Sequence, residues 1–404
     1  MTKATTNQPR SHILWRRVLA IAAIQGAITL TWVIYGLYFP QLLEKMGLSS
    51  DLALKILIIE NFLAALIEPV FGSLSDRFQQ RLGHRFIIIS FGVVLASALF
   101  ISLPAIALFH NPTETSALFF PAMAIAWAAA MAIFRSPALV LLNQTAPQQA
   151  LPQAASFLTF SNQFVGAFRF MAYGALLRLG PEVAFTIGSV FLLIALGFLR
   201  FQHPPHSGFT TTVSTTVTIP WGRAIAAIVC TALGIAWGLR FLSMTLVTII
   251  PRQWGENVVE GGLAAFFVAI ALFSFPAGAI ATRWGNGKAM TIGAATTALG
   301  LILLFLPLNA GATGAILALL AFCFSFVLNG MIPFVLALVP PHRVGLGLGC
   351  YFGVFSAAMS LFDLLLTPFN AIAPLAIATM GAGVLIIASI SISLTPRYSP
   401  VESL

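Results

Sequence analysis

Residues 72–85 read Gly-Ser-Leu-Ser-Asp-Arg-Phe-Gln-Gln-Arg-Leu-Gly-His-Arg, a charged stretch between two long apolar runs. Five ionisable side chains fall within ten residues here, in a chain of which only 8% is charged. Because charged side chains are costly in hydrocarbon, the stretch indicates a loop at a membrane face. We expect Gly72 and Gly83 to let the chain turn tightly where helices end.

The overall composition predicts an integral membrane protein. The chain has 404 residues and is 59% hydrophobic, whereas soluble domains are roughly half apolar and a quarter charged. We expect no cleavable signal peptide, because the N-terminal stretch is polar and the first apolar run is too long. The net charge of +9 is better explained by basic residues flanking the membrane than by nucleic-acid binding.

The apolar runs predict about twelve transmembrane helices, since a spanning helix needs about 20 mostly apolar residues. An even number of spans places both ends of the chain on the same side. The predicted spans are residues 16–39, 53–74, 86–109, 117–142, 153–177, 183–200, 222–250, 260–282, 289–308, 313–338, 345–369 and 373–394.

The basic residues predict the orientation, because cytoplasmic connections carry an excess of Lys and Arg. One set of connections carries four: Lys45, Lys55, Arg178 and Arg252. The other set carries thirteen: Lys3, Arg10, Arg16, Arg17, Arg77, Arg81, Arg85, Arg200, Arg223, Arg283, Lys288, Arg343 and Arg397. We therefore expect both termini and residues 72–85 to face the cytoplasm, with a bacterial inner membrane as the host.

The two halves of the chain echo each other. Gly72 precedes Arg77 as Gly278 precedes Arg283, with 206 residues between the copies, although Thr282 replaces Asp76. A polar segment at 201–221, with His203 and His206, reads as a solvated linker rather than a metal site. We predict an N-terminal six-helix bundle at 1–200, a cytoplasmic linker at 201–221 and a C-terminal six-helix bundle at 222–404.

The stretch at 72–85 resembles the loop between the second and third helices of major facilitator transporters. Its Ser-Asp-Arg, three residues, then Arg-x-Gly-x-Arg is similar to glycoside–pentoside–hexuronide:cation symporters and plant sucrose transporters. Residues 134–147 resemble bacterial relatives of the sucrose transporters, with Asn143 or Gln144 where many relatives carry an acid. The resemblance implies an all-α fold of two pseudo-symmetric six-helix bundles. It also implies a cytoplasmic gating loop that holds the outward-open state, with Gly72, Asp76, Arg77, Arg81, Gly83 and Arg85.

Charged residues inside the predicted spans are functional candidates because of their cost in the bilayer. Their depths along the helices predict two ion pairs, Glu68 with Arg135 and Arg240 with Asp363. Each pair can serve transport or simply lock helices together. For Arg169 we favour a structural role or snorkelling towards the outer face.

Glu60 has no basic residue at matching depth. A buried carboxyl group without a cationic partner is favoured in its protonated form, so it can carry a proton. We predict Glu60 as the proton-coupling residue, with Asp363 and Glu68 as the next candidates.

In the family's architecture, helices one, four, seven and ten line a central cavity. The resemblance therefore implies substrate contacts for polar or aromatic residues on these helices, each of which can alternatively be an interhelical hydrogen bond. They are Gln25, Tyr35, Arg135, Trp237, Arg240 and Asn329.

These observations predict a monomeric secondary active transporter that moves a small polar organic solute, such as a glycoside, by alternating access and proton symport. No phosphate-binding loop, catalytic triad, zinc pattern or cofactor motif is evident, and Cys230, Cys323 and Cys350 read as core residues. An enzyme, a metal site and a nucleic-acid partner are not expected. Two alternatives stay open: efflux of amphiphilic compounds, and a non-transporting membrane assembly or pigment-handling factor on the same fold.

Overall fold

The computed structural model describes residues 12–109, 114–203, 220–366 and 373–395, which form helices and no strands. The first group of α-helices is α1 (Trp15–Lys45), α2 (Leu52–Leu82), α3 (Phe86–Phe109), α4 (Glu114–Val140), α5 (Leu151–Met171), α6 (Tyr173–Leu179) and α7 (Pro181–Gln202). The second group is α8 (Trp221–Trp254), α9 (Val259–Trp284), α10 (Asn286–Leu303), α11 (Ala310–Leu338), α12 (Val344–Leu366) and α13 (Pro374–Ser393). Short 3-10 helices are η1 (Leu141–Gln144), η2 (Gln148–Ala150), η3 (Glu256–Val258) and η4 (Pro341–Arg343).

The fold is all-α, as predicted, with twelve long α-helices and the seven-residue α6 in the described ranges. By length and composition, nine helices of that part of the chain can cross a membrane. The more polar α2, α5 and α10 complete the twelve. Several helices continue past their predicted spans: α2, for example, reaches Leu82 rather than residue 74.

The prediction that residues 72–85 form a loop is largely wrong. Residues up to Leu82 belong to α2, and the chain turns only at Gly83, whose φ of 76° lies in the left-handed region. Gly72 lies inside the helix and makes no turn. Charge alone did not separate the two possibilities, because a helix that projects beyond the bilayer can carry charged residues as well as a loop can.

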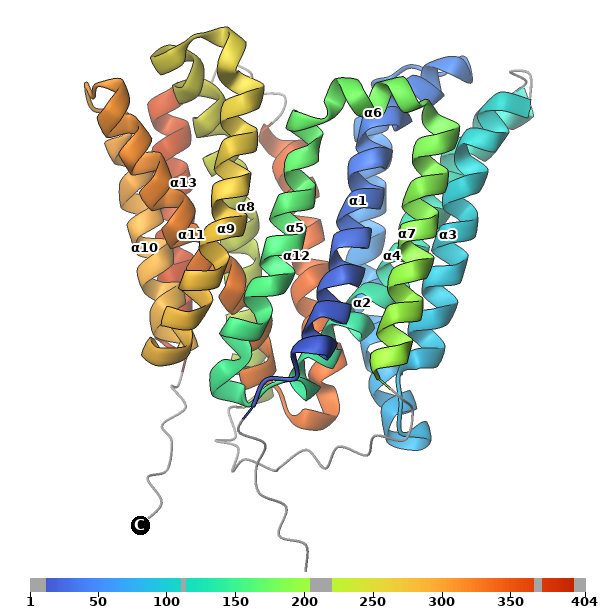
Figure 1. Cartoon of the computed structure of the whole chain (residues 1–404), viewed down its shortest axis with the longest axis horizontal. Coiled ribbons are helices and arrows are strands. Elements are labelled where there is room, and N and C mark those ends of the chain that lie inside the picture. Colours follow the sequence, from blue (N-terminus) through green and yellow to red (C-terminus); the bar gives the residue numbers. More distant parts are fainter. Residues whose placement is uncertain (1–11, 110–113, 204–219, 367–372, 396–404) are drawn as a thin grey trace, which may run out of the picture.

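The helices form two groups of six long helices (Figure 1). Within the first group, α1 packs on α5 and α7, and α3 packs on α4 and α7. Within the second, α13 packs on α8 and α10, and α9 packs on α11. The two groups, called the halves below, meet mainly where α2 packs on α12 and α5 packs on α9.

Small residues allow α2 and α12 to approach closely. Gly345, Gly349 and Gly353 repeat every fourth residue, so they lie on one face of α12. A Cβ atom on Gly345 would overlap the carbonyl of Gly72, and one on Gly353 would lie 2.9 Å from the Ala65 carbonyl. The glycine face therefore packs against the α2 backbone, as small residues do between helices in lipid.

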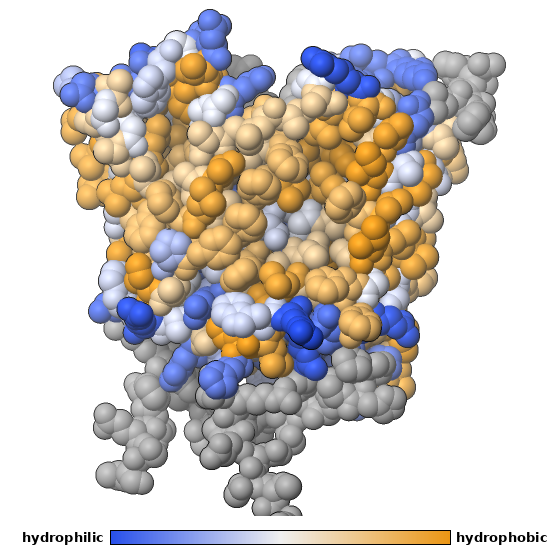
Figure 2. Space-filling view, in the orientation of Figure 1, coloured by the Kyte–Doolittle hydropathy of each residue, from blue (hydrophilic) through white to orange (hydrophobic). Residues whose placement is uncertain are grey.

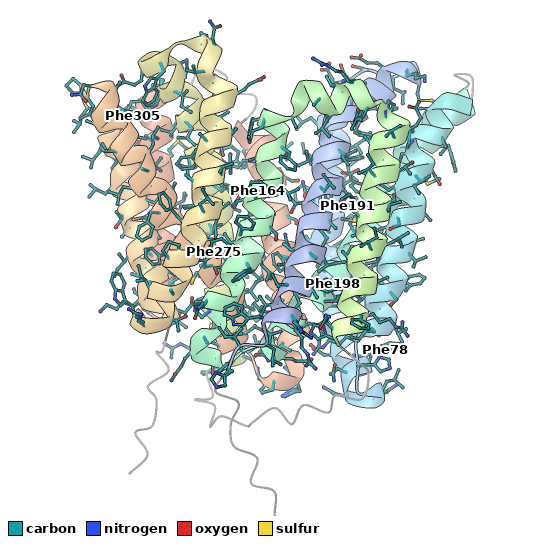
Figure 3. The ribbon with its side chains drawn as sticks, in the orientation of Figure 1. Phe78, Phe164, Phe191, Phe198, Phe275 and Phe305 are labelled. Carbon is teal, nitrogen blue, oxygen red and sulfur yellow. The ribbon has the colours of Figure 1, made fainter. Side chains whose placement is uncertain are left out.

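The contact between α5 and α9 is related to this one by the internal repeat. A Cβ atom on Gly278 of α9 would lie 2.9 Å from the carbonyl of Pro152 on α5. Aromatic rings continue this contact along the helices, because Phe275 of α9 packs on Phe157 and Phe160 of α5, with ring centroids 4.9 and 5.1 Å apart. Figure 3 labels Phe275 and, on α5, Phe164.

The outer surface matches a membrane protein. On the face shown in Figure 2, a wide band of hydrophobic residues lies between two ends where hydrophilic residues gather. We call the end with the starts of α1, α5, α8 and α12 the basic end, and the other the opposite end. Figure 2 also shows a notch between the two halves at the opposite end.

We predicted that His203 lies in a solvated linker, but it is the C-cap residue of α7. Its side chain is 3% exposed, contacts the Leu199 carbonyl at 3.1 Å and packs near the Phe86 ring. Burial lowers the pKa of His203 to about 4, so the ring is neutral at pH 7. His206 and most of the predicted linker lie outside the described residues.

Candidate functional site

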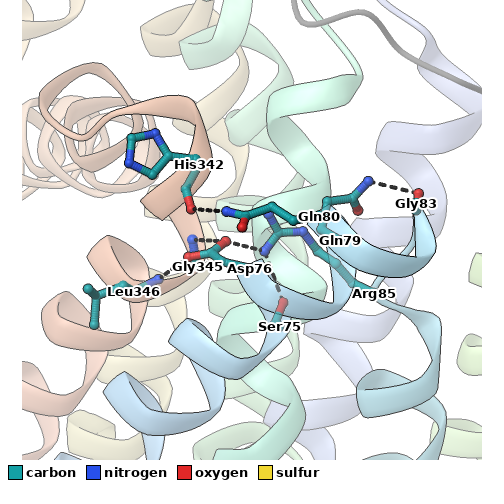
Figure 4. Close-up of polar contacts among 9 residues, drawn as sticks. All are labelled: Ser75, Asp76, Gln79, Gln80, Gly83, Arg85, His342, Gly345 and Leu346. Carbon is teal, nitrogen blue, oxygen red and sulfur yellow. Dashed lines mark hydrogen bonds and ion pairs between the residues drawn. The ribbon is translucent and has the colours of Figure 1, made fainter.

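A cluster of polar contacts joins the two halves at the basic end (Figure 4). Asp76, near the end of α2, accepts hydrogen bonds from the backbone N–H groups of Gly345 and Leu346, both at 2.9 Å. Arg85 pairs with the Asp76 carboxylate at 2.8 Å and donates to Ser75. We call Asp76, Arg85, Gly345 and Leu346 the basic-end gate.

The gate holds because it satisfies groups that would otherwise be unpaired. The first N–H groups of a helix have no partner within it, and its N-terminus favours a negative charge. Asp76 supplies both an acceptor and a charge to the start of α12. Burial lowers the pKa of the Arg85 guanidinium, and the neighbouring Asp76 carboxylate opposes that shift.

The gating residues expected from the resemblance divide into two sets. Asp76 and Arg85 are 4% and 3% exposed and form the gate, while Gly72 lies at the close contact with Gly345. Arg77 and Arg81 are exposed at the surface of α2. The partner of Asp76 is thus Arg85 rather than the adjacent Arg77.

Arg135 on α4 connects three helices deeper in the molecule. Its Nη2 pairs with Glu68 of α2, and the same atom donates to Ser356 of α12 at 3.1 Å. Its guanidinium also lies 5.0 Å from the centre of the Phe352 ring. The predicted Glu68–Arg135 pair is confirmed, and Arg135 additionally contacts the other half of the molecule.

Glu60 belongs to α2, and its side chain contacts α1 and is 2% exposed. It accepts a hydrogen bond of 2.5 Å from the hydroxyl of Tyr35, while its second oxygen is buried without a partner. No cationic side chain pairs with it among the described residues, as its depth predicted. Tyr35 packs in turn on Trp127, with ring centroids 4.5 Å apart.

The second predicted ion pair is confirmed as well. Arg240 of α8 pairs with Asp363 of α12 at 2.5 Å, within the second half. The Arg240 side chain is 33% exposed, so the pair lies beside accessible space. One turn earlier on α8, Trp237 donates its indole N–H to the Ala358 carbonyl of α12 at 2.8 Å.

The remaining predicted contact residues form hydrogen bonds between helices. Gln25 of α1 donates to Asn162 of α5 at 3.3 Å, and Thr29 donates to the same oxygen at 2.7 Å. Asn329 is fully buried and donates to the Ser274 carbonyl of α9. In this conformation Asn329 has the interhelical role that we left open as the alternative to substrate contact.

One face of α1 is accessible without lying on the apolar surface band. Its partly or fully exposed residues recur at helical spacing: Gln25, Thr29, Trp32, Gly36 and Pro40. Two of them reach α5 through Asn162. These side chains are partly accessible, as are those of Arg135 and Arg240, which are 21% and 33% exposed.

A separate cavity of about 550 Å³ lies between α8, α9 and α11, near the opposite end. Its lining is almost entirely apolar and includes Ile250, Trp254 and Phe266. None of the predicted site residues lines it. Within the described part of the chain, no group of three or more His, Cys, Asp or Glu side chains could hold a metal ion.

Sequence reasoning missed several partners. Nothing in the local sequence marks Ser356 and Asn162 as the partners of Arg135 and Gln25. Asn329 donates to the backbone carbonyl of Ser274, a group that every residue carries. The approach of α2 to α12 did have a signal. The spacing Gly345-x-x-x-Gly349 is typical of close helix contacts in membranes, although it does not name the partner helix.

Solved structures share this fold at low sequence identity. FucP in the outward conformation has a TM-score of 0.70 at 12% identity, covering 94% of this chain and 99% of that one. The human organic anion transporter MFSD10 has a TM-score of 0.66 at 14% identity, and the match covers 95% of this chain and 100% of that one. A bacterial homologue of the iron transporter ferroportin, in an outward-facing state with soaked iron, has a TM-score of 0.67 at 11% identity. That match covers 93% of this chain and 98% of the homologue. At these identities the likeness shows the fold alone.

No curated protein matches the chain significantly. The family model for the Major Facilitator Superfamily matches residues 21–362, which is most of the chain and extends from α1 into α12. This match agrees with the apolar helices, the two six-helix groups and the contacts between them. The chain is therefore a multi-pass membrane transporter, not an enzyme, and it belongs to the Major Facilitator Superfamily.

Proposed function

We propose that the protein is a proton-coupled symporter for a small organic solute and that Glu60 carries the coupling proton. The observation that carries this proposal is the buried carboxyl group of Glu60, which has a tyrosine partner and no cation among the described residues. A charge in this position is costly. The oxygen without a partner is where a proton can be held.

The arrangement of the contacts supports a mechanism of alternating access. The gate and the Arg135–Ser356 bond join the halves towards the basic end, while the notch lies at the opposite end. Breaking the gate and closing the notch would turn the binding space towards the other side of the membrane. We take the two groups of helices, α1 to α7 and α8 to α13, as the two moving bodies.

The basic end is proposed to face the cytoplasm of a bacterial inner membrane. Arg77, Arg81 and Arg283 are exposed there, and the positive-inside rule assigns such an excess to the cytoplasmic side. The twelve long helices then place both termini in the cytoplasm. We propose a monomer, because the space between the halves lies within a single chain.

Glu60→Gln tests the coupling. A screen of radiolabelled solutes in proteoliposomes, with imposed pH and sodium gradients, first identifies a transported solute. The neutral glutamine resembles the protonated acid, so the variant should insert and fold. Accumulation driven by a pH gradient should vanish, while exchange of solute between equal pools should continue.

The matched control is Glu44→Gln, which removes an exposed carboxylate at the end of α1. It should accumulate solute as the parent does. Full accumulation by Glu60→Gln would exclude Glu60 as the coupling residue and leave Asp363 and Glu68. Loss of both accumulation and exchange would show that Glu60 has a structural role.

A further inference from the structure

Trp32 is a partly accessible tryptophan in the middle of a transmembrane helix. It lies near the midpoint of α1, away from the membrane faces where tryptophan commonly anchors a helix. Its ring packs on the fully buried Trp127 of α4, with centroids 4.8 Å apart, and meets the Tyr35 ring edge-on at 5.8 Å. Part of an aromatic ring that is held in place by its neighbours is therefore left accessible.

The neighbours of α1 indicate where this accessible side faces. Gly26 contacts α5, and Tyr35, on the opposite side of the helix, contacts α2. Between them, Ile34 contacts α7 on one flank, and Trp32 lies on the other, less covered flank. Helices α5 and α2 are the ones that pack on the second half, through α9 and α12. The flank with Trp32 therefore opens towards the second half.

The surface around Trp32 suits a flat ring that carries polar groups. Gly36, one turn further along α1, has no heavy atom within 4 Å of an added Cβ, so there is open space beside the indole. One turn in the other direction, Thr29 donates to Asn162 of α5 at 2.7 Å and is itself partly accessible. An aromatic or other flat ring can pack on the accessible part of the indole, with its polar groups near this hydrogen bond.

The same aromatic cluster leads to the proposed proton site. Tyr35 packs on Trp127 with ring centroids 4.5 Å apart, and it donates its hydroxyl to Glu60 at 2.5 Å. A hydrogen bond donated to a carboxylate favours the ionised form. A movement of Trp32 that draws Tyr35 away from Glu60 would therefore favour uptake of the proton.

Tyr35 is the titratable group that contacts Glu60 among the described residues. Helix α2 packs mainly on α12, α4 and α1. On α4, Arg135 pairs with Glu68, and on α12, Asp363 pairs with an arginine of α8. These charges already have partners, so the hydroxyl of Tyr35 is the group whose position the proton on Glu60 depends on.

We propose that Trp32 is the positioning residue that links the solute to the proton. A solute packs a flat ring on Trp32, the indole draws Tyr35 away from Glu60, and Glu60 takes up a proton. Solute and proton then favour each other's binding, as symport requires. This inference rests on the proposed symport and names its substrate class as solutes that carry an aromatic or other flat ring.

The link between Glu60 and Trp32 is tested on the purified protein without a solute. Fluorinated tryptophan replaces all seven tryptophans, and the fluorine resonance of Trp32 is assigned by its absence from Trp32→Phe. This resonance should shift with pH in the parent. The shift should be lost in Glu60→Gln and largely lost in Tyr35→Phe, which removes only the hydroxyl. The resonance of the exposed Trp284 is the control and should be alike in all three proteins.

The link is overturned if the Trp32 resonance does not respond to pH in the parent, or if it titrates equally in Glu60→Gln. An unchanged titration in Tyr35→Phe would overturn the route through the tyrosine hydroxyl.

A covalently attached ring tests the docking surface. Gly36→Cys, in a chain whose native cysteines are replaced by alanine, is modified with benzyl methanethiosulfonate or with the ringless propyl reagent. The benzyl group should move the titration of the Trp32 resonance to higher pH by about 0.7 unit or more, which is an about fivefold coupling. The propyl group should have a smaller effect. Gly197→Cys on α7, also at an uncrowded position, is the control and should show no shift.

Four results would overturn docking on Trp32: failure of Gly36→Cys to react, no shift with the benzyl group, a shift to lower pH, or equal shifts with both reagents. The relay and the coupling role fail separately. If Trp32 responds to Glu60 but Glu60→Gln still accumulates solute, the relay stands and Glu60 is not the coupling residue. If Glu60→Gln loses accumulation while Trp32 does not respond, the coupling role stands and the relay is overturned.

Discussion

Gly72→Val is expected to reduce transport by about 100-fold or more while leaving membrane insertion unchanged. A Cβ atom on Gly72 would overlap the carbonyl of Gly345, which is backbone and cannot move aside as a flexible side chain can. Helix α2 must then withdraw from α12, and Asp76 loses the N–H groups of Gly345 and Leu346. The basic end can no longer close, so the transport cycle stops. Initial rates of uptake in proteoliposomes measure the effect.

Gly197→Val is the matched control, because Gly197 is also inside a helix but has no heavy atom within 4 Å of an added Cβ. It introduces the same side chain and should transport as the parent does. Parent-like transport by Gly72→Val would show that the tight contact between α2 and α12 is not needed for the cycle.

Arg135→Met is expected to lower both stability and transport. Removing the cation leaves the fully buried Glu68 carboxyl group without its partner, and breaking a buried pair in this way costs about 3–5 kcal/mol. The contacts of Arg135 with Ser356 and Phe352 are lost together with it. Thermal unfolding in detergent and uptake in proteoliposomes measure the two effects separately.

The double variant Glu68→Gln/Arg135→Met separates structure from function. It removes the unpaired charge, so most of the lost stability should return, while transport should stay low because the contact with the second half is still missing. Arg283→Met, at an exposed position of the basic end, is the control and should change neither quantity. Normal transport by the double variant would show that Glu68 and Arg135 form an ion pair with a structural role only.

The depth of charges along the helices was predictable from the sequence. Counting residues from the helix ends predicted the pairs of Glu68 with Arg135 and of Arg240 with Asp363, and both are present. Counting succeeds because an α-helix rises by a fixed 1.5 Å per residue and an ion in hydrocarbon needs a partner. The internal repeat predicted that Gly278 corresponds to Gly72, and both lie at close helix contacts, although the turn expected at Gly72 is absent.

The direction in which side chains point was not predictable in the same way. Glu60 has no cation at its depth, yet the hydroxyl of Tyr35 reaches it, and only the rotation of α1 against α2 brings them together. Similarly, Arg85 rather than Arg77 pairs with Asp76, because the chain turns at Gly83 and returns Arg85 to the gate. Such contacts depend on how helices are rotated and where the chain reverses, which a single sequence does not specify.

Distances between spin labels test the alternation of the two halves most directly. One pair of labels replaces the exposed Arg81 and Arg283 at the basic end, and another replaces the exposed Asp51 and Glu256 at the opposite end. Cys230, Cys323 and Cys350 are first changed to alanine. Weakening the gate with Asp76→Asn should lengthen the distance between the first pair and shorten that between the second. Changes in the same direction at both ends, or no change at either, would contradict alternating access by two rocking halves.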